Sequence, residues 1–354
     1  MSPHFWAGMN KSPLNNNNGD PLFSVSFLFY EKGLYCRGTL ESSDDQFCRG
    51  KSEATVQLLV LRLYFKVSKS SSLEILPAML LLLLLQVSAS CFWLGRSEVV
   101  TSFEHSCTQF FFRGAPPNEA LEPENPAWIC QRHQNRYHFA TLYDRNRRIP
   151  VYSAYLYQPK PCTRPKTWLV EPQLMGLNYP KNMETEETFL KKFHVSLDQL
   201  SESQAVLQDY KNLKGLNRGH LNPCGHHSNP SSRAATFTLT NIVPQDEKLN
   251  GGAWNNYEEQ TMKMKTQGCN TTYVVVGAVP GNNYIANGRV NIPSYLWSSA
   301  CCEVGTHHWK SWAVIAENDK NQVRLLTLGE LEDELTRLYG GKQVSLFNNN
   351  CPRK

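Results

Sequence analysis

The stretch that decides the fold consists of three short blocks and one glutamate: GLNRGHLNP at 215–223, TNIVPQ at 240–245, LNGGAW at 249–254, and Glu258. Asn241 and Asn250 are nine residues apart, and Glu258 follows Asn250 by eight residues. Residues 251–267 contain no proline and carry apolar side chains at helical spacing. We therefore expect a strand–loop–helix unit from about 216 to 266.

The flanking sequence adds strands rather than a repeating strand–helix pattern. Residues 136–143 and 149–157 mix aromatic and β-branched side chains on either side of a basic turn, and 273–279 is an apolar β-branched run. Residues 236–242 alternate as a strand does, whereas 184–213 are charged and helix-leaning. Because no βαβ rhythm is present, an α+β fold is favoured over a doubly wound parallel sheet.

The three blocks resemble the signature of the DNA/RNA non-specific endonucleases of the ββα-metal (His-Me finger) superfamily: Asp-Arg-Gly-His, then Asn-Ile-x-Pro-Gln, then Asn-x-Gly-x-Trp and a glutamate. Flanking blocks look like the secreted animal branch, the endonuclease domain-containing 1 proteins, and the resemblance covers about 103–345. It implies a ββα-metal fold with a central, mostly antiparallel sheet, flanked by helices and stabilised by disulfides. It also implies a secreted, Mg²⁺-dependent endonuclease, with Mn²⁺ as the alternative ion, that binds DNA and RNA through the phosphate backbone.

The residue types suit hydrolysis of a phosphodiester by an activated water. Imidazole has an ordinary pKa of about 6.5, so His220 can accept the proton of a water as general base. Magnesium takes oxygen ligands and keeps most of its waters, so the amide oxygen of Asn250 can bind it, as the family pattern implies; the structural alternative is a helix N-cap. Glu258 lies about 80° from Asn250 around a helix and could hold metal-bound waters. Alternatively Glu258 faces solvent and Glu259 is the working residue.

Three further side chains are candidates for positioning and for substrate binding. Arg218 stands beside His220 and offers a bidentate fork to phosphate. Asn241 would orient the histidine or the attacking water, or else it satisfies a strand end. The resemblance places Arg148 at a phosphate contact, but the turn that contains it is equally typical of a solvated loop.

Two departures from the family pattern bear on activity. Asn217 stands where the family has aspartate, and Met262 stands where some relatives carry a substrate arginine, for which Lys263 or Lys265 could substitute. These departures motivate a second hypothesis, a nuclease-derived binding or signalling protein that no longer cuts. The retained histidine, asparagine and glutamate argue against it. A third alternative, a phosphodiesterase for small nucleotides, requires a closed pocket.

Composition sets wide bounds on the function. The 354 residues include 36 Lys+Arg and 31 Asp+Glu, a net charge of +5 that permits a polyanionic partner without requiring one. Of the 11 cysteines, nine lie from Cys91 onward, and none of these forms a CxxC pair. Scattered cysteines in a larger domain are typical of disulfides in an oxidising compartment. The adjacent Cys301 and Cys302 are expected to bond to different partners.

An apolar segment precedes the blocks by more than 100 residues. Six leucines at 80–85 follow a basic flank and are followed by small residues, so 66–90 resembles a secretory signal with cleavage after Ser90. The run is too short for a stable membrane span, although a short anchor with a cytoplasmic tail is the alternative. We expect 1–65 to be a non-native or disordered extension and 91–354 to be the endonuclease domain.

Two smaller motifs complete the sequence-based predictions. Asn270 begins an Asn-Thr-Thr sequon, a glycosylation site if the chain enters the secretory route. Cys224, His226 and His227 lie near His220, but they lack the spread of a four-ligand zinc site. Trp254 is expected to pack in the core beneath the helix rather than to stack on a base.

Overall fold

The computed structural model describes residues 5–9, 25–31, 34–38, 98–305 and 308–354. Contacts divide the chain into two units, Met1–Ala89 and Ser90–Lys354. The first unit contains an antiparallel sheet of β1 (Phe5–Met9), β2 (Val25–Glu31) and β3 (Leu34–Gly38). The signal-like segment and Cys91 lie outside the described residues. Within the described part of the chain, no helix has the length and apolar character needed to cross a membrane.

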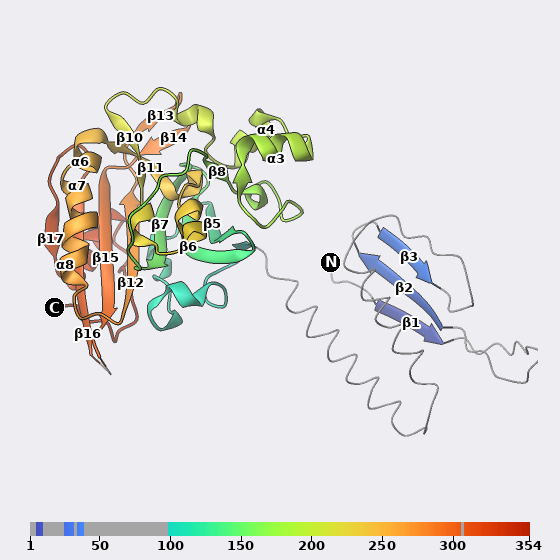
Figure 1. Ribbon diagram of the computed structural model, residues 1–354, viewed down its shortest axis with the longest axis horizontal. Coiled ribbons are helices and arrows are strands. Elements are labelled where there is room, and N and C mark those ends of the chain that lie inside the picture. The colour runs from blue at the N-terminus through green and yellow to red at the C-terminus, as the bar shows by residue number, and fades with distance from the viewer. Residues whose placement is uncertain (1–4, 10–24, 32–33, 39–97, 306–307) are drawn as a thin grey trace, which may run out of the picture. The chain divides into compact units, whose positions relative to one another are not determined.

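The second unit is built on an eight-stranded sheet in the order β17-β16-β15-β12-β7-β6-β5-β4, in which every neighbouring pair is antiparallel (Figure 1). The predicted α+β class with a central antiparallel sheet is confirmed, as are the three strands expected around 136–143, 149–157 and 273–279. The strands are β4 (Val99–Val100), β5 (Pro126–His133), β6 (Arg136–Asp144), β7 (Ile149–Leu156), β12 (Thr271–Val279), β15 (Tyr295–Glu303), β16 (Trp309–Glu317) and β17 (Arg324–Leu326).

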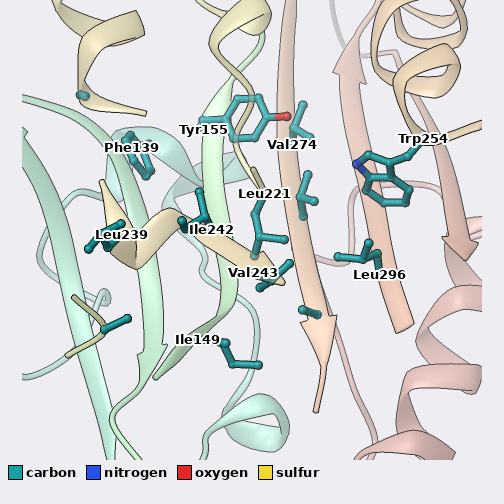
Figure 2. Close-up of a cluster of buried hydrophobic side chains, with 14 of the residues drawn as sticks. Phe139, Ile149, Tyr155, Leu221, Leu239, Ile242, Val243, Trp254, Val274 and Leu296 are labelled. Atoms are coloured by element: carbon teal, nitrogen blue, oxygen red, sulfur yellow. The ribbon is translucent and has the colours of Figure 1, made fainter. Parts of the chain in front are cut away.

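Successive side chains of a strand point to opposite faces of the sheet, and here both sets are buried, so both faces are covered. Val274 and Val276 of β12 belong to one buried cluster, whereas Val275 belongs to the other. The first cluster includes Leu221, Ile242, Trp254 and further side chains that pack onto the sheet (Figure 2). The second cluster contains one face of α9 (Leu328–Leu338) and the phenylalanines at 103–112. The result is a three-layer arrangement with the sheet in the middle.

The layer on the first face carries the strand–loop–helix unit. Its elements are β8 (Leu169–Val170), β9 (Glu184–Thr185), α3 (Glu186–Phe193), α4 (Leu197–Ser203), β10 (Leu216–His220), α5 (Pro230–Ala235), β11 (Ile242–Asp246), α6 (Glu247–Gly251), α7 (Ala253–Asn256), a π-helical turn (Tyr257–Thr261), α8 (Met262–Lys265), β13 (Asn283–Ile285) and β14 (Val290–Ile292). The strand predicted over 236–242 is wrong. That segment is mostly a turn and a 3₁₀ helix, and the strand begins at Ile242, because the polar side chains before it hydrogen-bond locally.

Four disulfides join distant segments of this unit: Cys107–Cys130, Cys162–Cys224, Cys269–Cys302 and Cys301–Cys351. The adjacent Cys301 and Cys302 do bond to different partners, as expected. Closing loops of this kind removes conformational freedom from the unfolded chain, typically worth about 2–4 kcal/mol each. Disulfide stabilisation of the fold is therefore confirmed.

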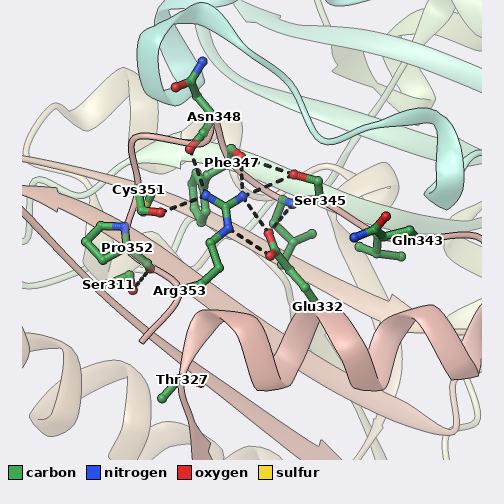
Figure 3. Close-up of polar contacts among 12 residues, drawn as sticks. Ser311, Thr327, Glu332, Gln343, Ser345, Phe347, Asn348, Cys351, Pro352 and Arg353 are labelled. Carbon is green, nitrogen blue, oxygen red and sulfur yellow. Dashed lines mark hydrogen bonds and ion pairs between the residues drawn. The ribbon is translucent and has the colours of Figure 1, made fainter.

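The last residues of the chain are fastened to α9 by one arginine (Figure 3). The Arg353 guanidinium donates to both carboxylate oxygens of Glu332 at 3.0 and 3.1 Å and to the Phe347 carbonyl at 2.6 Å. It also donates to the carbonyls of Asn348 and Cys351. A bidentate, charge-assisted pair of this kind is stronger than neutral hydrogen bonds, so it holds the tail over the second buried cluster.

Two carboxyl groups lie side by side in the interior beneath β4. Glu98 and Glu171 are both fully buried, and one Glu171 oxygen accepts from the Thr238 hydroxyl at 2.7 Å and the Thr240 hydroxyl at 3.1 Å. Burial, reinforced by Glu171, raises the pKa of Glu98 well above its ordinary value. Glu98 therefore keeps its proton to a higher pH than an ordinary glutamate does, and it can share that proton with Glu171.

This pair predicts a pH-dependent stability. Because the folded-state pKa of Glu98 is raised, the wild type should lose free energy of unfolding as the pH rises above about 4.5. Glu98→Gln keeps a donor toward Glu171 and removes that loss, so it should match the wild type near pH 4 and exceed it near pH 8. Urea unfolding across this range measures the effect. A variant that is less stable than the wild type near pH 8 would contradict it.

Candidate active site

His220 lies at the end of β10, which pairs antiparallel with β11 through His220 opposite Ile242 and Asn217 opposite Gln245. Alternation along the strand puts the side chains of Arg218 and His220 on one face and that of Asn217 on the other. Asn217 is exposed. The aspartate that the family has at this position is therefore replaced on the face that does not carry His220.

The glycine between Arg218 and His220 is required by a close approach. A Cβ atom at Gly219 would lie 2.1 Å from Oε1 and 2.6 Å from Cβ of Gln245 on the neighbouring strand. Both atoms belong to a buried side chain, so a residue larger than glycine would push the strands apart. The Arg-Gly-His pattern thus has a steric reason as well as a chemical one.

Aromatic rings enclose the imidazole of His220. The ring centroid lies 4.8 Å from that of Phe237, in an edge-on arrangement, and 5.5 Å from that of Trp168. The guanidinium of Arg218 lies 5.0 Å from the centroid of the same Trp168 ring and donates to the Tyr210 carbonyl at 3.3 Å. Trp168 therefore contacts both residues and fixes them next to one another.

The Nε2 atom of His220 is buried, and no described residue hydrogen-bonds to it. Burial lowers the pKa of His220 to about 3, and the positive charge of Arg164 pushes it in the same direction. The imidazole is therefore neutral at physiological pH. A buried, unpaired nitrogen of this kind calls for a partner, such as a water from which it could accept a proton.

Arg164 is a site residue that the sequence did not single out. It is exposed on the loop before Trp168, and its charge acts on both His220 and Glu258. The disulfide Cys162–Cys224 ties this loop to the turn that follows β10. The pairing of the cysteines was the missing signal, because connectivity cannot be read from sequence.

Arg148, by contrast, is held elsewhere. Its guanidinium donates to the backbone carbonyls of Ser201 at 3.3 Å and Arg289 at 3.2 Å. Those two carbonyls belong to the α4 region and the segment before β14, and no hydrogen bond or ring contact among the described residues joins Arg148 to His220. Of the two arginines, Arg164 is the one whose charge acts on the imidazole.

Asn250 lies within α6, directly after the β10–β11 pair. The N-cap of this helix is Asp246, whose carboxylate accepts from Lys248 N and Leu249 N at 2.9 Å. The capping alternative for Asn250 is therefore wrong, because another residue caps the start of the helix. The helix then kinks at Gly252, where a Cβ atom would lie 2.5 Å from the Lys248 carbonyl oxygen.

Glu258 lies in the π-helical turn Tyr257–Thr261. Burial raises its pKa to about 8; Glu259 adds to the rise, while Trp254 and Arg164 oppose it. Glu259 is exposed, whereas Glu258 is half-buried, so Glu258 is the more enclosed of the two. Trp254 is buried, as expected of a core residue. The helix that was predicted as continuous over 251–267 is thus interrupted twice, by the kink and by the π turn.

Asn241 has every polar atom of its side chain satisfied. Its amide donates to the carbonyls of Asn222 and Thr236, both at 2.9 Å, and its oxygen accepts from Ser153 Oγ at 2.9 Å and Asn222 N at 3.1 Å. It therefore has no atom left to orient a water, and its contacts fix the backbone two residues after His220.

Comparison with known proteins identifies the family. Residues 116–353 match the family described as DNA/RNA non-specific endonuclease. The chain belongs to this family. It is 32% identical over 249 residues to the endonuclease domain-containing 1 protein of Homo sapiens and 30% identical to that of Mus musculus; each match covers 69% of this chain and 47% of the relative. The resemblance predicted from the sequence is confirmed.

More distant relatives match a smaller part of the chain. Human mitochondrial endonuclease G is 30% identical over 125 residues, which cover 35% of this chain and 41% of that protein. A crystal structure of the EndoG/EndoGI complex matches with a TM-score of 0.41 and 18% identity, over 58% of this chain and 83% of that chain. The chain spans about half the length of the endonuclease domain-containing 1 proteins that it matches.

The residues of this endonuclease family member fit a hard divalent cation. Such an ion takes oxygen ligands and keeps several waters. Asn250 has an amide oxygen that is not used for capping, and Glu258 has a carboxylate. His220 has an unpaired nitrogen that can accept a hydrogen bond from a water. Among the described residues, no group of three His, Cys, Asp or Glu is placed to hold a metal ion. An ion would therefore be held by few protein atoms and by waters.

The residues that resembled a zinc cluster have other partners. Cys224 is bonded to Cys162, and His226 hydrogen-bonds through both ring nitrogens. His227 Nε2 lies 2.7 Å from Asn222 Oδ1. Burial lowers the pKa of His226 to about 4 and that of His227 to about 3, so both are neutral parts of the interior.

Met262 stands at the position where some relatives carry a substrate arginine. It is fully buried, whereas the neighbouring Lys263 is exposed.

The raised pKa of Glu258 can be measured without metal. In EDTA the folded protein should hold a proton on Glu258 up to about pH 8, so the wild type loses stability as the pH rises from about 4.5 toward 8. Glu258→Gln removes this loss and should melt several degrees above the wild type near pH 9, but not near pH 5. The exposed Glu259→Gln is the matched control and should follow the wild type. Equal melting curves for all three proteins would contradict the assignment.

Proposed function

We propose that residues 91–354 form a secreted, divalent-metal-dependent endonuclease that hydrolyses DNA and RNA without sequence preference. One observation carries the proposal: the buried Nε2 atom of His220, unpaired among the described residues, on a chain of this family. A neutral imidazole is ready to accept the proton of an attacking water at neutral pH. Water is the nucleophile, and no covalent intermediate is expected.

The other side chains supply binding and charge. Asn250 and Glu258 are the residues that would hold Mg²⁺, or Mn²⁺ as the alternative, directly and through its waters. When bound, the ion stabilises charge on the phosphoryl and leaving oxygens. Arg218 offers its guanidinium to phosphate, while Asn241 acts as a positioning residue. Phosphate contacts carry no sequence information, which accounts for the lack of specificity.

Secretion is supported by the oxidised cysteines and by the signal-like segment at 66–90. Four disulfides are typical of an oxidising compartment. We propose that the chain is cleaved after Ser90, that 1–65 is not part of the working protein, and that Asn270, which is exposed, carries a glycan.

A second candidate function is a nuclease-like protein that binds nucleic acid or signals without cutting. The complete burial of Met262 favours it, because an arginine is absent where some relatives use one. The exposed Lys263 offers a charge nearby but not a planar fork.

Digestion of plasmid and RNA distinguishes these functions. Secreted protein that begins at Cys91 should cut both substrates in Mg²⁺ and neither in EDTA. His220→Ala should lower the rate by about 10²–10⁴, the usual contribution of a general base. A wild type that binds both substrates but leaves them intact in Mg²⁺ and in Mn²⁺ would establish the binding protein instead.

Paired arginine variants identify the phosphate contact. Arg164→Ala should lower kcat/KM by about 10² and leave the melting temperature unchanged, because this side chain is exposed and its charge acts on His220 and Glu258. Arg148→Ala should instead lower stability, since it releases two backbone carbonyls. Loss of cleavage in Arg148→Ala with an active Arg164→Ala would reverse the assignment in favour of the contact that the resemblance implied.

A further inference from the structure

His226 joins the central sheet to the helix that carries Glu258. It ends the 3₁₀ turn Cys224–His226, six residues after the end of the β10 strand, and it is almost fully buried. Its Nδ1 atom lies 2.9 Å from the hydroxyl of Tyr155 on β7, and its Nε2 atom lies 3.0 Å from the backbone carbonyl oxygen of Glu258. One imidazole thus connects two elements of the site region.

The chemistry of the partners fixes the direction of both hydrogen bonds. A carbonyl oxygen only accepts, so Nε2 must carry the proton and donate to Glu258. A neutral imidazole then has Nδ1 as an acceptor, and the Tyr155 hydroxyl must donate to it. The relay therefore runs one way, from the Tyr155 hydroxyl through the imidazole to the main chain of Glu258.

The position of that carbonyl is unusual. Glu258 lies in the π-helical turn, and π turns are rare single-turn widenings of a helix that cluster at functional sites. His226 donates to the backbone at the point where the helix widens. The carbonyl and the carboxylate both belong to Glu258, so a movement of this carbonyl also moves the carboxylate.

The turn that holds His226 is itself rigid. Gln158 N donates to the His226 carbonyl at 2.9 Å, and Lys160 N donates to the Gly225 carbonyl at 3.1 Å. The disulfide Cys162–Cys224 closes the same turn, and the Tyr157 ring packs edge-on against the imidazole with centroids 4.6 Å apart. A hydrogen-bond donor in such a rigid turn can fix the position of the Glu258 carbonyl rather than adjust to it.

We propose that His226 is a positioning residue for the metal-dependent reaction: through the Glu258 carbonyl it sets where the Glu258 carboxylate stands relative to His220 and Asn250. The inference rests on the proposed function, because it gives Glu258 a role at the ion. Outer partners of this kind typically change metal affinity by about 10–100-fold when they are lost.

Two variants, each keeping one of the two hydrogen bonds, test the proposal. The amide nitrogen of His226→Gln reaches as far as Nε2 and can still donate to Glu258, whereas the shorter His226→Asn can accept only from Tyr155. Mn²⁺ binding is followed by electron paramagnetic resonance, together with kcat, KM and melting temperature. We expect Gln to keep Mn²⁺ affinity and kcat within about twofold of the wild type, and Asn to lose about tenfold in each.

The outcomes separate this inference from the proposed function. Equal Mn²⁺ affinity and kcat in the Gln and Asn variants would show that His226 is only structural. If Glu258→Gln binds Mn²⁺ as the wild type does, the proposed role of Glu258 fails first. Should His226→Asn not fold, Tyr155→Phe replaces it: loss of the hydroxyl frees the imidazole and should weaken Mn²⁺ binding about threefold, and unchanged binding overturns the proposal.

Discussion

The buried amide of Asn241 connects the segments on which the site depends. It bonds at once to β7 through Ser153, to the chain beyond His220 through Asn222, and to the turn before β11 through Thr236. An unsatisfied buried polar group costs about 1–3 kcal/mol, so any arrangement that separated these segments would leave several such groups unpaired. The site region is therefore fixed to the centre of the sheet by one side chain whose polar atoms are all used in this network.

Burial then decides the charges of the side chains around it. It lowers the pKa of His220 to about 3 and raises that of Glu258 to about 8, so both are uncharged at neutral pH before any ion binds. The positive charge of Arg164 opposes protonation of His220 and favours ionisation of Glu258. Charge interactions in such surroundings are stronger than in water, so a positive charge that approached Glu258 would favour its ionised carboxylate.

The sequence predicted those parts of the fold that follow from local pattern. The strands around 136–143, 149–157 and 273–279 stand where alternation and β-branched runs placed them, and three spaced blocks were enough for the family. The strand near 242 was misplaced because threonine and asparagine side chains bond to nearby backbone, which periodicity does not reveal. The π turn was missed for a similar reason, since no residue pattern distinguishes it from an ordinary helix.

Arg164 shows why part of the site could not be read from the sequence. It stands more than 50 residues before His220, on a loop without regular structure, and the Cys162–Cys224 disulfide ties this loop to the turn after β10, so that its charge acts on the imidazole. The other three disulfides of the described chain fasten elements of the sheet and the tail, whereas this one fastens the site. The same bond closes the turn that holds His226. One covalent link therefore supports both the loop of Arg164, whose charge acts on Glu258, and the turn whose histidine donates to the Glu258 carbonyl, so this cysteine pair bears on the geometry of the site as well as on the stability of the fold.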